Sequence, residues 1–351
     1  MAQKKGDGRA ALQALKGQLS SGQIGQLYLF HGEEVYLRDF YLGRLREQLV
    51  GGGMEEFNLH TLKAGEVTPR ALEEAVDCLP MMSQRTLVLL VDFDPLKAGE
   101  KDREAYARLL GSLPDYCCVV LVYDLIPYKA DARTKLAAVF RDKGLVVNFA
   151  RQEQGDLVDW IRRRFRALGR DIDSELARYL IFLCGDLMTG LIGEIEKIGA
   201  YAKGSRVTRQ DIDAVATPQL DAVVFQMTDA IAASKADRAA QVLGDLYHMQ
   251  EPPLRILAAL GRHIRQLYSA RLILEAHKGT DALMALWGMQ KAYPAQKLME
   301  AARRFPLSWC RWAAVRCGET DLAIKSGGGD GQELLTLLLM ELSCRDRRGT
   351  C

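Results

Sequence analysis

The sequence predicts an α/β domain with a parallel β-sheet, followed by an all-helical region. Two continuous apolar runs, Thr86–Asp92 and Cys117–Tyr123, indicate strands that are buried on both faces, as in a parallel sheet covered by helices. After about residue 152 the strand patterns stop, and apolar residues recur at the spacing of helices. A chain of 351 residues is long enough for two or three domains of this kind.

The α/β region should hold five strands with helices between them, which is the pattern of a doubly wound sheet. Its first strand is rich in β-forming residues and leads into a glycine. The expected strands are Gln26–Phe30, Glu56–Leu62, Thr86–Asp92, Cys117–Tyr123 and Leu145–Phe149, and the expected helices are Val35–Val50, Thr68–Asp77, Asp102–Leu113 and Ala130–Lys143.

The helical region divides near Thr217–Pro218, where no helix pattern continues. Before this break we expect helices over Asp156–Leu168, Asp173–Leu183, Leu187–Tyr201 and Thr208–Val215. After it we expect Ala222–Ala233, Ala236–Met249, Pro252–Glu275, Met284–Gly288, Tyr293–Arg303, Leu307–Leu322 and Gly331–Ser343. The expected domains are therefore residues 1–150, 151–217 and 218–351.

Composition narrows the class of protein. The chain is 48% hydrophobic and 26% charged with a net charge of +2, which is ordinary for a globular protein and gives no overall polyanion-binding signature. It has no apolar run of membrane-spanning length and no secretory leader pattern. Its eight cysteines form no C-x-x-C pair, so we expect reduced thiols and no metal site.

The segment Gln26–Arg38 has the strand–turn–helix layout of a phosphate-binding loop but not its residues. A working loop reads G-x-x-x-x-G-K-[ST], with a lysine that reaches the phosphates. Here a single glycine, Gly32, is followed by Glu33 and Glu34, whose charges would occupy the place of the anion. The sequence therefore predicts a nucleotide-binding scaffold that no longer binds a nucleotide.

The strand Thr86–Asp92 ends in an acid, as does a Walker B strand, whose aspartate holds the magnesium ion of a bound nucleotide. No catalytic acid follows Asp92, because the next residue is Phe93. We interpret Asp92 as a structural strand end, and residual metal binding is the alternative.

Two adjacent methionines, Met81 and Met82, follow Pro80 between a helix and a buried strand. Adjacent side chains point in different directions, so both are difficult to bury together. Methionine is common at adaptable binding surfaces, and a protruding apolar pair could enter a hydrophobic pocket of a partner. The alternative is that one methionine packs inward and the other is exposed without a role.

Two basic helices are candidate nucleic-acid contacts. One carries Arg162, Arg163, Arg164 and Arg166, and the other is Arg255–Arg271. An arginine cluster of this kind is more often a solvated helix face beside an apolar stripe, and phosphate contact is the alternative. His263 lies in the second helix without a ligand or nucleophile constellation around it, so we expect a packing or surface residue.

Four motifs together resemble the delta subunit of the bacterial DNA polymerase III clamp loader, over about Ile24 to Ser343. The first is LYLFHGEEVYLRD, similar to that family's opening strand and degenerate loop. The second is LPMMSQRTLVLLVD, similar to its clamp-contacting helix end and third strand. The others are DLMTGLIGEIEKIGAYA and the segment Phe225–Leu267, similar to its lid signature and the start of its collar.

This resemblance implies an AAA+-type α/β parallel-sheet domain, then a small helical lid domain and an all-helical collar domain. It implies a bacterial, cytoplasmic subunit without cofactor, metal or active site of its own, within a DNA polymerase holoenzyme. The partners would be the sliding clamp (beta subunit), the tau/gamma ATPase subunits and delta-prime in a hetero-pentamer, and primed DNA. The clamp-binding residues would be Met81 and Met82, with Leu79, Pro80 and Arg85 shaping the contact.

Two alternatives from other classes remain open. The first is an active AAA+ ATPase or helicase loader, against which the missing lysine argues. The second is a sequence-independent DNA-binding protein that uses Arg162–Arg166 and the basic collar helix.

Overall fold

A computed structural model describes residues 5–51, 55–129 and 134–344. The chain forms two compact units. Unit 1 comprises the residues up to Glu153 together with Leu187–Thr189, and unit 2 comprises Gln154–Asp186 and the residues from Gly190 onward. The helices on both sides of Thr217 belong to unit 2, and the division of the chain into three domains stays a prediction.

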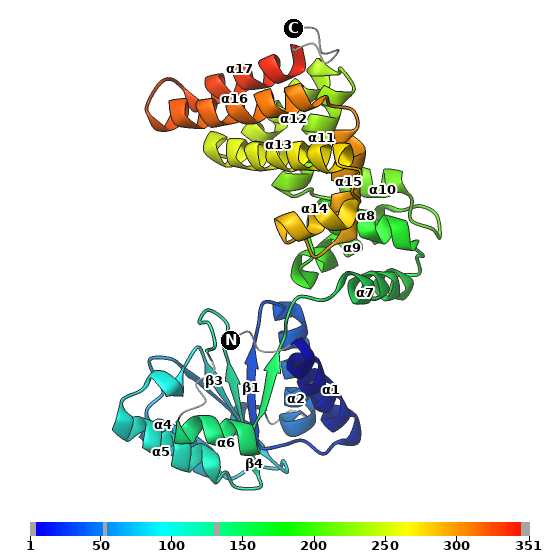
Figure 1. Cartoon of the computed structure of the whole chain (residues 1–351). Helices are drawn as coiled ribbons and strands as arrows, with labels where there is room; N and C mark the ends of the chain where they lie inside the picture. The colour runs from blue at the N-terminus through cyan, green and yellow to red at the C-terminus, as the bar shows by residue number, and fades with distance from the viewer. Residues whose placement is uncertain (1–4, 52–54, 130–133, 345–351) are drawn as a thin grey trace. The chain divides into compact units, whose positions relative to one another are not determined.

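Unit 1 is a five-stranded parallel sheet in the order β2-β3-β4-β1-β5, with helices on both faces (Figure 1). Its strands are β1 Leu27–His31, β2 Leu59–Lys63, β3 Thr86–Val91, β4 Cys117–Val122 and β5 Leu145–Asn148. Its helices are α1 Lys5–Ser21, α2 Val35–Val50, α3 Glu55–Asn58, α4 Pro69–Asp77, the 3₁₀ turn η1 Pro95–Lys97, α5 Glu100–Gly111 and α6 Lys135–Lys143.

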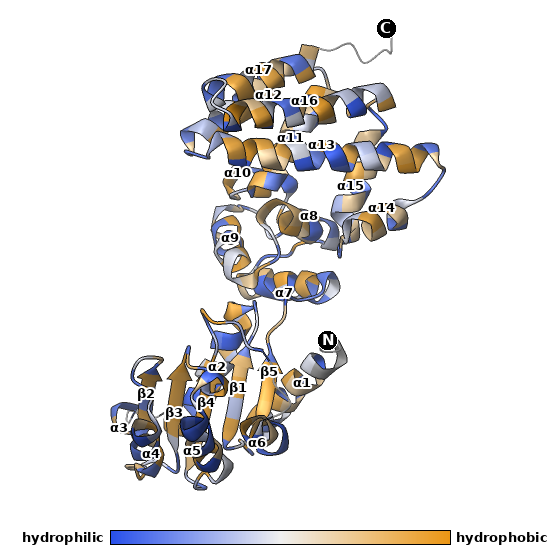
Figure 2. Ribbon diagram, turned by 60° about the vertical axis from the view of Figure 1, so that its left-hand side comes forward, coloured by the Kyte–Doolittle hydropathy of each residue, from blue (hydrophilic) through white to orange (hydrophobic). Residues whose placement is uncertain are grey.

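The alternation of side chains along each strand divides the core of unit 1 into two layers. Leu27 and Leu29 of β1 pack on one face with α4, α5 and α6. Tyr28 and Phe30 pack on the other face with α1 and α2. Strands β3 and β4 are buried along most of their length, and Figure 2 shows β3 in hydrophobic colours. The prediction of a parallel sheet that helices cover on both sides is therefore confirmed.

Three sequence predictions for unit 1 differ from the structure. The expected strand Glu56–Leu62 is a single helical turn, α3, followed by β2, and only the second part is extended. Helix α1 was not predicted, although its Leu15 and Leu19 belong to the core. The helix expected over Ala130–Lys143 begins at Lys135, and residues 130–133 lie outside the described part of the chain.

The regular elements among the described residues of unit 2 are helices, apart from an isolated β-bridge between Asp171 and Arg206. Its helices are α7 Gln154–Ala167, α8 Ser174–Cys184, most of α9 Met188–Tyr201, α10 Arg209–Val215, α11 Leu220–Ala232, α12 Ala236–His248, α13 Pro253–Glu275, α14 Thr280–Trp287, α15 Ala292–Ala302, α16 Leu307–Lys325 and α17 Gly331–Cys344. One apolar cluster from α11 to α17 forms the core of this unit, and the long α13 packs along α16 within it. The aromatic pair Phe305–Trp309 stacks inside it at 4.2 Å between ring centroids.

His263 of α13 is a packing residue, as predicted, and only 6% of it is exposed. The Thr228 hydroxyl donates to Phe225 O at 2.9 Å, so its oxygen accepts from His263 Nε2 at 2.8 Å. Burial lowers the pKa of His263 to about 3. The folded chain therefore holds this ring neutral over a pH range in which the unfolded chain protonates it.

This histidine should make unit 2 sensitive to acid. Its contribution to stability is complete above the unfolded pKa of about 6.5 and is lost as the pH falls toward the folded pKa of about 3. We expect the free energy of unfolding to fall by about 2 kcal/mol between pH 7 and pH 5. All four tryptophans (Trp160, Trp287, Trp309 and Trp312) lie in unit 2, so their fluorescence reports its unfolding.

The variant His263→Gln keeps a donor for Thr228 and removes the titration, so its stability should change less with pH. The matched variant His248→Gln alters an exposed histidine and should retain the full pH dependence. Equal slopes for wild type and His263→Gln would contradict the assignment.

Candidate functional site

The methionine loop, residues 78–85, connects α4 to β3. Thr68 caps the start of α4 by accepting from Ala71 N at 3.1 Å, and Pro69 occupies its first turn. The helix ends at Asp77 because the backbone of Cys78 leaves the helical region, and Pro80 follows two residues later. The loop therefore lies at the edge of the sheet where β3 begins.

Both methionines of this loop face solvent. Met82 is 86% exposed and Met81 is 54% exposed, and the neighbouring Leu79 is exposed as well. The expectation that one methionine packs inward is therefore wrong. Met82 has a φ of +53°, an uncommon backbone conformation for a residue with a side chain. A positive φ and an exposed apolar pair at one position make this loop a candidate binding surface.

Asn58, at the end of α3, holds the methionine loop in place. Its side chain is fully buried and makes two hydrogen bonds to the backbone of Met81. Met81 N donates to Asn58 Oδ1 at 2.7 Å, and Asn58 Nδ2 donates to Met81 O at 2.9 Å. Because both polar groups of Met81 are paired with one buried amide, the loop has a defined position before any partner arrives.

Further along the loop, Ser83 and Arg85 tie it to the sheet. The Ser83 hydroxyl lies 3.0 Å from Leu49 O and 3.2 Å from Arg85 O. The guanidinium of Arg85 donates to Ile24 O, Gly25 O and Cys117 O at 2.8 to 3.2 Å. Arg85 thus shapes the surface by anchoring its base, while Pro80 is half-buried beside the tip.

At the opposite edge of the sheet, Gly32 is required by the packing of the chain. Its φ is +121°, and a Cβ atom there would lie 2.5 Å from Phe149 O. The next turn is fixed by a hydrogen bond from Glu34 N to Phe149 O at 2.8 Å. The glycine of this loop therefore serves a close backbone approach, which needs no phosphate.

The charged groups around Gly32 are engaged by other parts of the chain. Glu33 pairs with Arg151 at 2.6 Å, and the carboxylate of the fully buried Glu34 accepts from Met188 N, which belongs to the same unit, at 3.2 Å. Burial lowers the pKa of His31 to about 4, so its ring is neutral at pH 7. The carboxylates of Glu33 and Glu34 would repel a triphosphate, and the neutral ring of His31 would not attract one.

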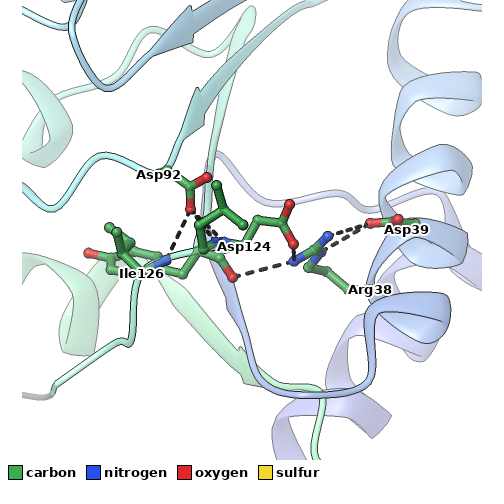
Figure 3. A network of polar contacts seen from close by, with 7 residues as sticks. Arg38, Asp39, Asp92, Asp124 and Ile126 are labelled. Carbon is green, nitrogen blue, oxygen red and sulfur yellow. Dashed lines mark hydrogen bonds and ion pairs between the residues drawn. The ribbon is translucent and has the colours of Figure 1, made fainter. Parts of the chain in front are cut away.

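Asp92 is engaged in holding a loop. Its carboxylate Oδ1 accepts from the backbone N–H groups of Asp124, Leu125 and Ile126 at 2.8, 2.7 and 3.4 Å (Figure 3). The backbone of Asp92 lies in the left-handed region, at φ +54°. These contacts support the interpretation of Asp92 as a structural residue that ends the strand.

Arg38 completes this network from α2. It is 4% exposed and donates to Asp124 Oδ1 at 2.8 Å, to Tyr123 O at 3.4 Å and to Asp39 Oδ1 at 3.0 Å (Figure 3). Burial works to lower the pKa of Arg38, but the hydrogen bonds and charges of Asp124 and Asp39 outweigh it and raise the pKa. The buried guanidinium of Arg38 is thus paired with carboxylates of the chain itself.

The arginine cluster of α7 is uneven. Arg163 and Arg166 are exposed, and Arg166 lies 3.9 Å from Asp171. Arg164 lies over the Trp160 ring at 5.7 Å, and Arg162 is half-buried. The helix therefore presents Arg163 and Arg166 as the side chains most accessible to a phosphate.

Unit 2 also contains a cavity of about 380 Å³ lined by Arg178, Arg262, Lys291 and His263, among other residues. Arg178 pairs with Glu175, Arg262 with Asp221 and Lys291 with Asp186. The cavity has aromatic walls, but its cationic groups are neutralised by neighbouring carboxylates.

The described residues offer neither a clustered metal-ligand set nor a single membrane-spanning helix. No group of three or more His, Cys, Asp or Glu side chains there could hold a metal ion. The seven cysteines within the described ranges are free thiols, and Cys351 lies outside them. In the same part of the chain, no single helix is long and apolar enough to span a membrane. One bent pair of helices has, taken together, the length and composition of a spanning segment.

The fold and these contacts define a five-stranded parallel-sheet domain covered by helices on both faces, followed in the chain by a helical region. Two family profiles match the chain. "DNA polymerase III, delta subunit" matches residues 28–150, and "DNA polymerase III delta subunit, C-terminal domain" matches residues 221–342, together more than half of the sequence. The chain belongs to the family of DNA polymerase III delta subunits, as the four motifs indicated.

Individual relatives agree with the family assignment. A DNA polymerase III subunit delta from Bacillus subtilis is 24% identical over 340 residues, which cover 94% of this chain and 96% of that protein. A probable DNA polymerase III subunit delta from Aquifex aeolicus is 23% identical over 74% of each chain. The solved Bacillus subtilis DNA clamp loader delta protein has the same fold, with a TM-score of 0.57, 22% identity and coverage of 95% and 100% of the two chains.

Sequence reasoning did not find Asn58, Ser83 or Arg38. Asn58 lies 23 positions before Met81 in the sequence, and its two bonds to Met81 depend on the pairing of β2 with β3. Nothing in the local pattern marks it, because an asparagine before a strand is ordinary turn chemistry.

The role of Asp92 can be tested by two substitutions. Asp92→Gly suits the positive φ but removes the acceptor for three amides, so we expect a loss of about 1–3 kcal/mol in the stability of unit 1. Hydrogen exchange should accelerate at Asp124, Leu125 and Ile126. Asp92→Asn keeps an acceptor oxygen and tolerates the left-handed conformation, so its effect should be smaller. Unchanged exchange in Asp92→Gly would contradict the loop-holding role.

Proposed function

We propose that this chain binds the sliding clamp through Met81 and Met82 and opens its ring for loading onto primed DNA, without binding or hydrolysing ATP itself. The observation that carries the proposal is an adjacent, exposed apolar pair on a loop held by a buried asparagine. The family membership supports it, because a delta subunit of DNA polymerase III works within a clamp-loader complex.

The pair is suited to anchor in an apolar pocket. Apolar anchors at the centre of an interface can each contribute 2 kcal/mol or more, measured by truncation. Leu79 extends the apolar surface and Arg85 fixes its base to the sheet. Since the loop is ordered by Asn58 in advance, little of the binding energy would be spent on fixing its conformation.

Ring opening would follow from differential binding. A wedge that contacts the clamp better when one interface is open shifts the clamp toward the open state by the difference in binding free energy. ATP would act on the neighbouring subunits. In this proposal the tau/gamma subunits and delta-prime complete a hetero-pentamer through the collar helices and control the access of this loop to the clamp.

Within the assembled complex, this chain would contact primed DNA through α7. Arg163 and Arg166 on α7 are the accessible members of the cluster, and Arg162 and Arg164 contribute less because they are partly covered. Arginines of this kind contact phosphates without reading sequence.

The clamp-binding role predicts a large effect of truncation. The double variant Met81→Ala/Met82→Ala should weaken binding of the full chain to the clamp at least about thirtyfold, which corresponds to about 2 kcal/mol. The measurement is surface plasmon resonance or calorimetry with purified clamp. The matched variant Met249→Ala/Met340→Ala removes two exposed methionines of unit 2 and should bind as wild type does. If the loop variant kept full affinity, the clamp-binding assignment would be wrong.

The degenerate loop predicts no nucleotide affinity. A fluorescent ATP analogue titrated into the isolated chain should show no saturable binding through the millimolar range, because Glu33 and Glu34 stand where the phosphates would lie. Micromolar affinity would favour the alternative of an active AAA+ ATPase.

A further inference from the structure

The two side chains assigned to the clamp contact are thioethers that water and small oxidants can reach. Met82, with Leu125, has the highest exposure among the large hydrophobic residues of the described chain, at 86%. Its backbone has a positive φ, and the hydrogen bonds between Asn58 and Met81 hold the preceding residue in place. A leucine or an aromatic residue in the same place would offer an apolar surface without an oxidisable sulfur.

Accessibility separates these two sulfurs from the buried methionines of the chain. Met188, Met227 and Met299 are each at most 7% exposed. Met249 and Met340 are exposed, but both lie in unit 2, outside the methionine loop. Since thioether oxidation requires the oxidant to reach the sulfur, Met82 should react earliest and Met81 next among the methionines of unit 1 that the structure describes.

The reaction is a single oxygen transfer. A peroxide gives one oxygen atom to the sulfur, an S–O bond forms, the O–O bond breaks, and the rest of the peroxide leaves as water or an alcohol. The sulfur loses two electrons and the peroxide gains them. The product, a methionine sulfoxide, is polar and chiral, and enzymes of the methionine sulfoxide reductase class reduce it back with thiol electrons.

We propose that Met82, together with Met81, is an oxidative modification site, and that its oxidation by peroxide releases this chain from the clamp. The proposal rests on the proposed clamp-binding function. A sulfoxide oxygen is a strong hydrogen-bond acceptor, so it must lose water when it enters an apolar pocket that offers no donor. The same group that contributes apolar area when reduced therefore opposes binding when oxidised.

The test treats the full-length chain with hydrogen peroxide and follows each methionine by peptide mass spectrometry. Complete conversion at Met82 should weaken clamp binding at least about tenfold. Treatment with both epimer-specific sulfoxide reductases and dithiothreitol should restore the affinity, because peroxide produces both epimers. Dithiothreitol alone should not restore it, and this arm excludes the exposed Cys78 as the cause.

Two variants complete the test. Met81→Leu/Met82→Leu has no sulfur in the loop, so whatever its own affinity is, peroxide should leave that affinity unchanged. Met249→Leu/Met340→Leu should lose clamp binding on oxidation to the same degree as wild type. Wild type that keeps its affinity with Met82 fully oxidised overturns the proposal, as does an equal loss in the loop leucine variant. The alanine variant of the loop, measured without oxidant, decides the clamp-binding function separately.

Discussion

The pair of hydrogen bonds between the Asn58 amide and the Met81 backbone is the constraint on which the exposed methionines depend. Asn58 is fully buried, so each of its polar atoms would cost about 1–3 kcal/mol if left unpaired. The backbone of Met81 satisfies both at once. A loop that turned its methionines inward would have to break these bonds and leave a buried amide without them. The hydrophobic gain from covering Met82 would be about 1.5–3 kcal/mol, which is no more than the cost of losing two hydrogen bonds to a buried amide.

At the opposite edge of the sheet, side-chain hydrogen bonds to the backbone hold a second loop in place. Asp92 and Arg38 could serve a nucleotide by charge, but each is engaged by groups of the chain itself. Asp92 accepts from the loop after β4, and Arg38 joins that loop to α2 through Asp124. With the phosphate-binding lysine absent, the site remains folded because internal hydrogen bonds replace those to a ligand. The charged groups at this edge of the sheet are thus engaged within the chain.

The sequence predicted the strands whose burial on both faces produces a continuous apolar run. The strands β3 and β4 are covered on both faces, so their apolar runs are continuous and could be recognised. The strand β2 lies at an edge and is half-exposed, and a single turn of helix precedes it, so its pattern was read as one longer strand. Helix α1 was missed because only a few of its residues, such as Leu15 and Leu19, enter the core.

One part of the candidate site could be predicted from the sequence and another part could not. The adjacency of Met81 and Met82 was visible in the sequence, and both prove exposed. What holds them was not visible, because Asn58 reaches Met81 only once β2 and β3 are paired. Arg85 was predicted to shape the contact, and that role stays a prediction. Its hydrogen bonds go to the carbonyls of Ile24, Gly25 and Cys117, which lie outside the loop.

The position of β3 between the two sites limits how they could communicate. The methionine loop precedes this strand and Asp92 follows it, and a strand of six residues separates its ends by about 20 Å. A ligand at the carboxyl edge of the sheet would therefore not touch the methionine loop. Strand β3 is buried and paired on both sides, which makes it a rigid spacer between them. If the exposure of the methionines to a clamp is controlled by ATP, the control must come from other subunits that cover or uncover the loop.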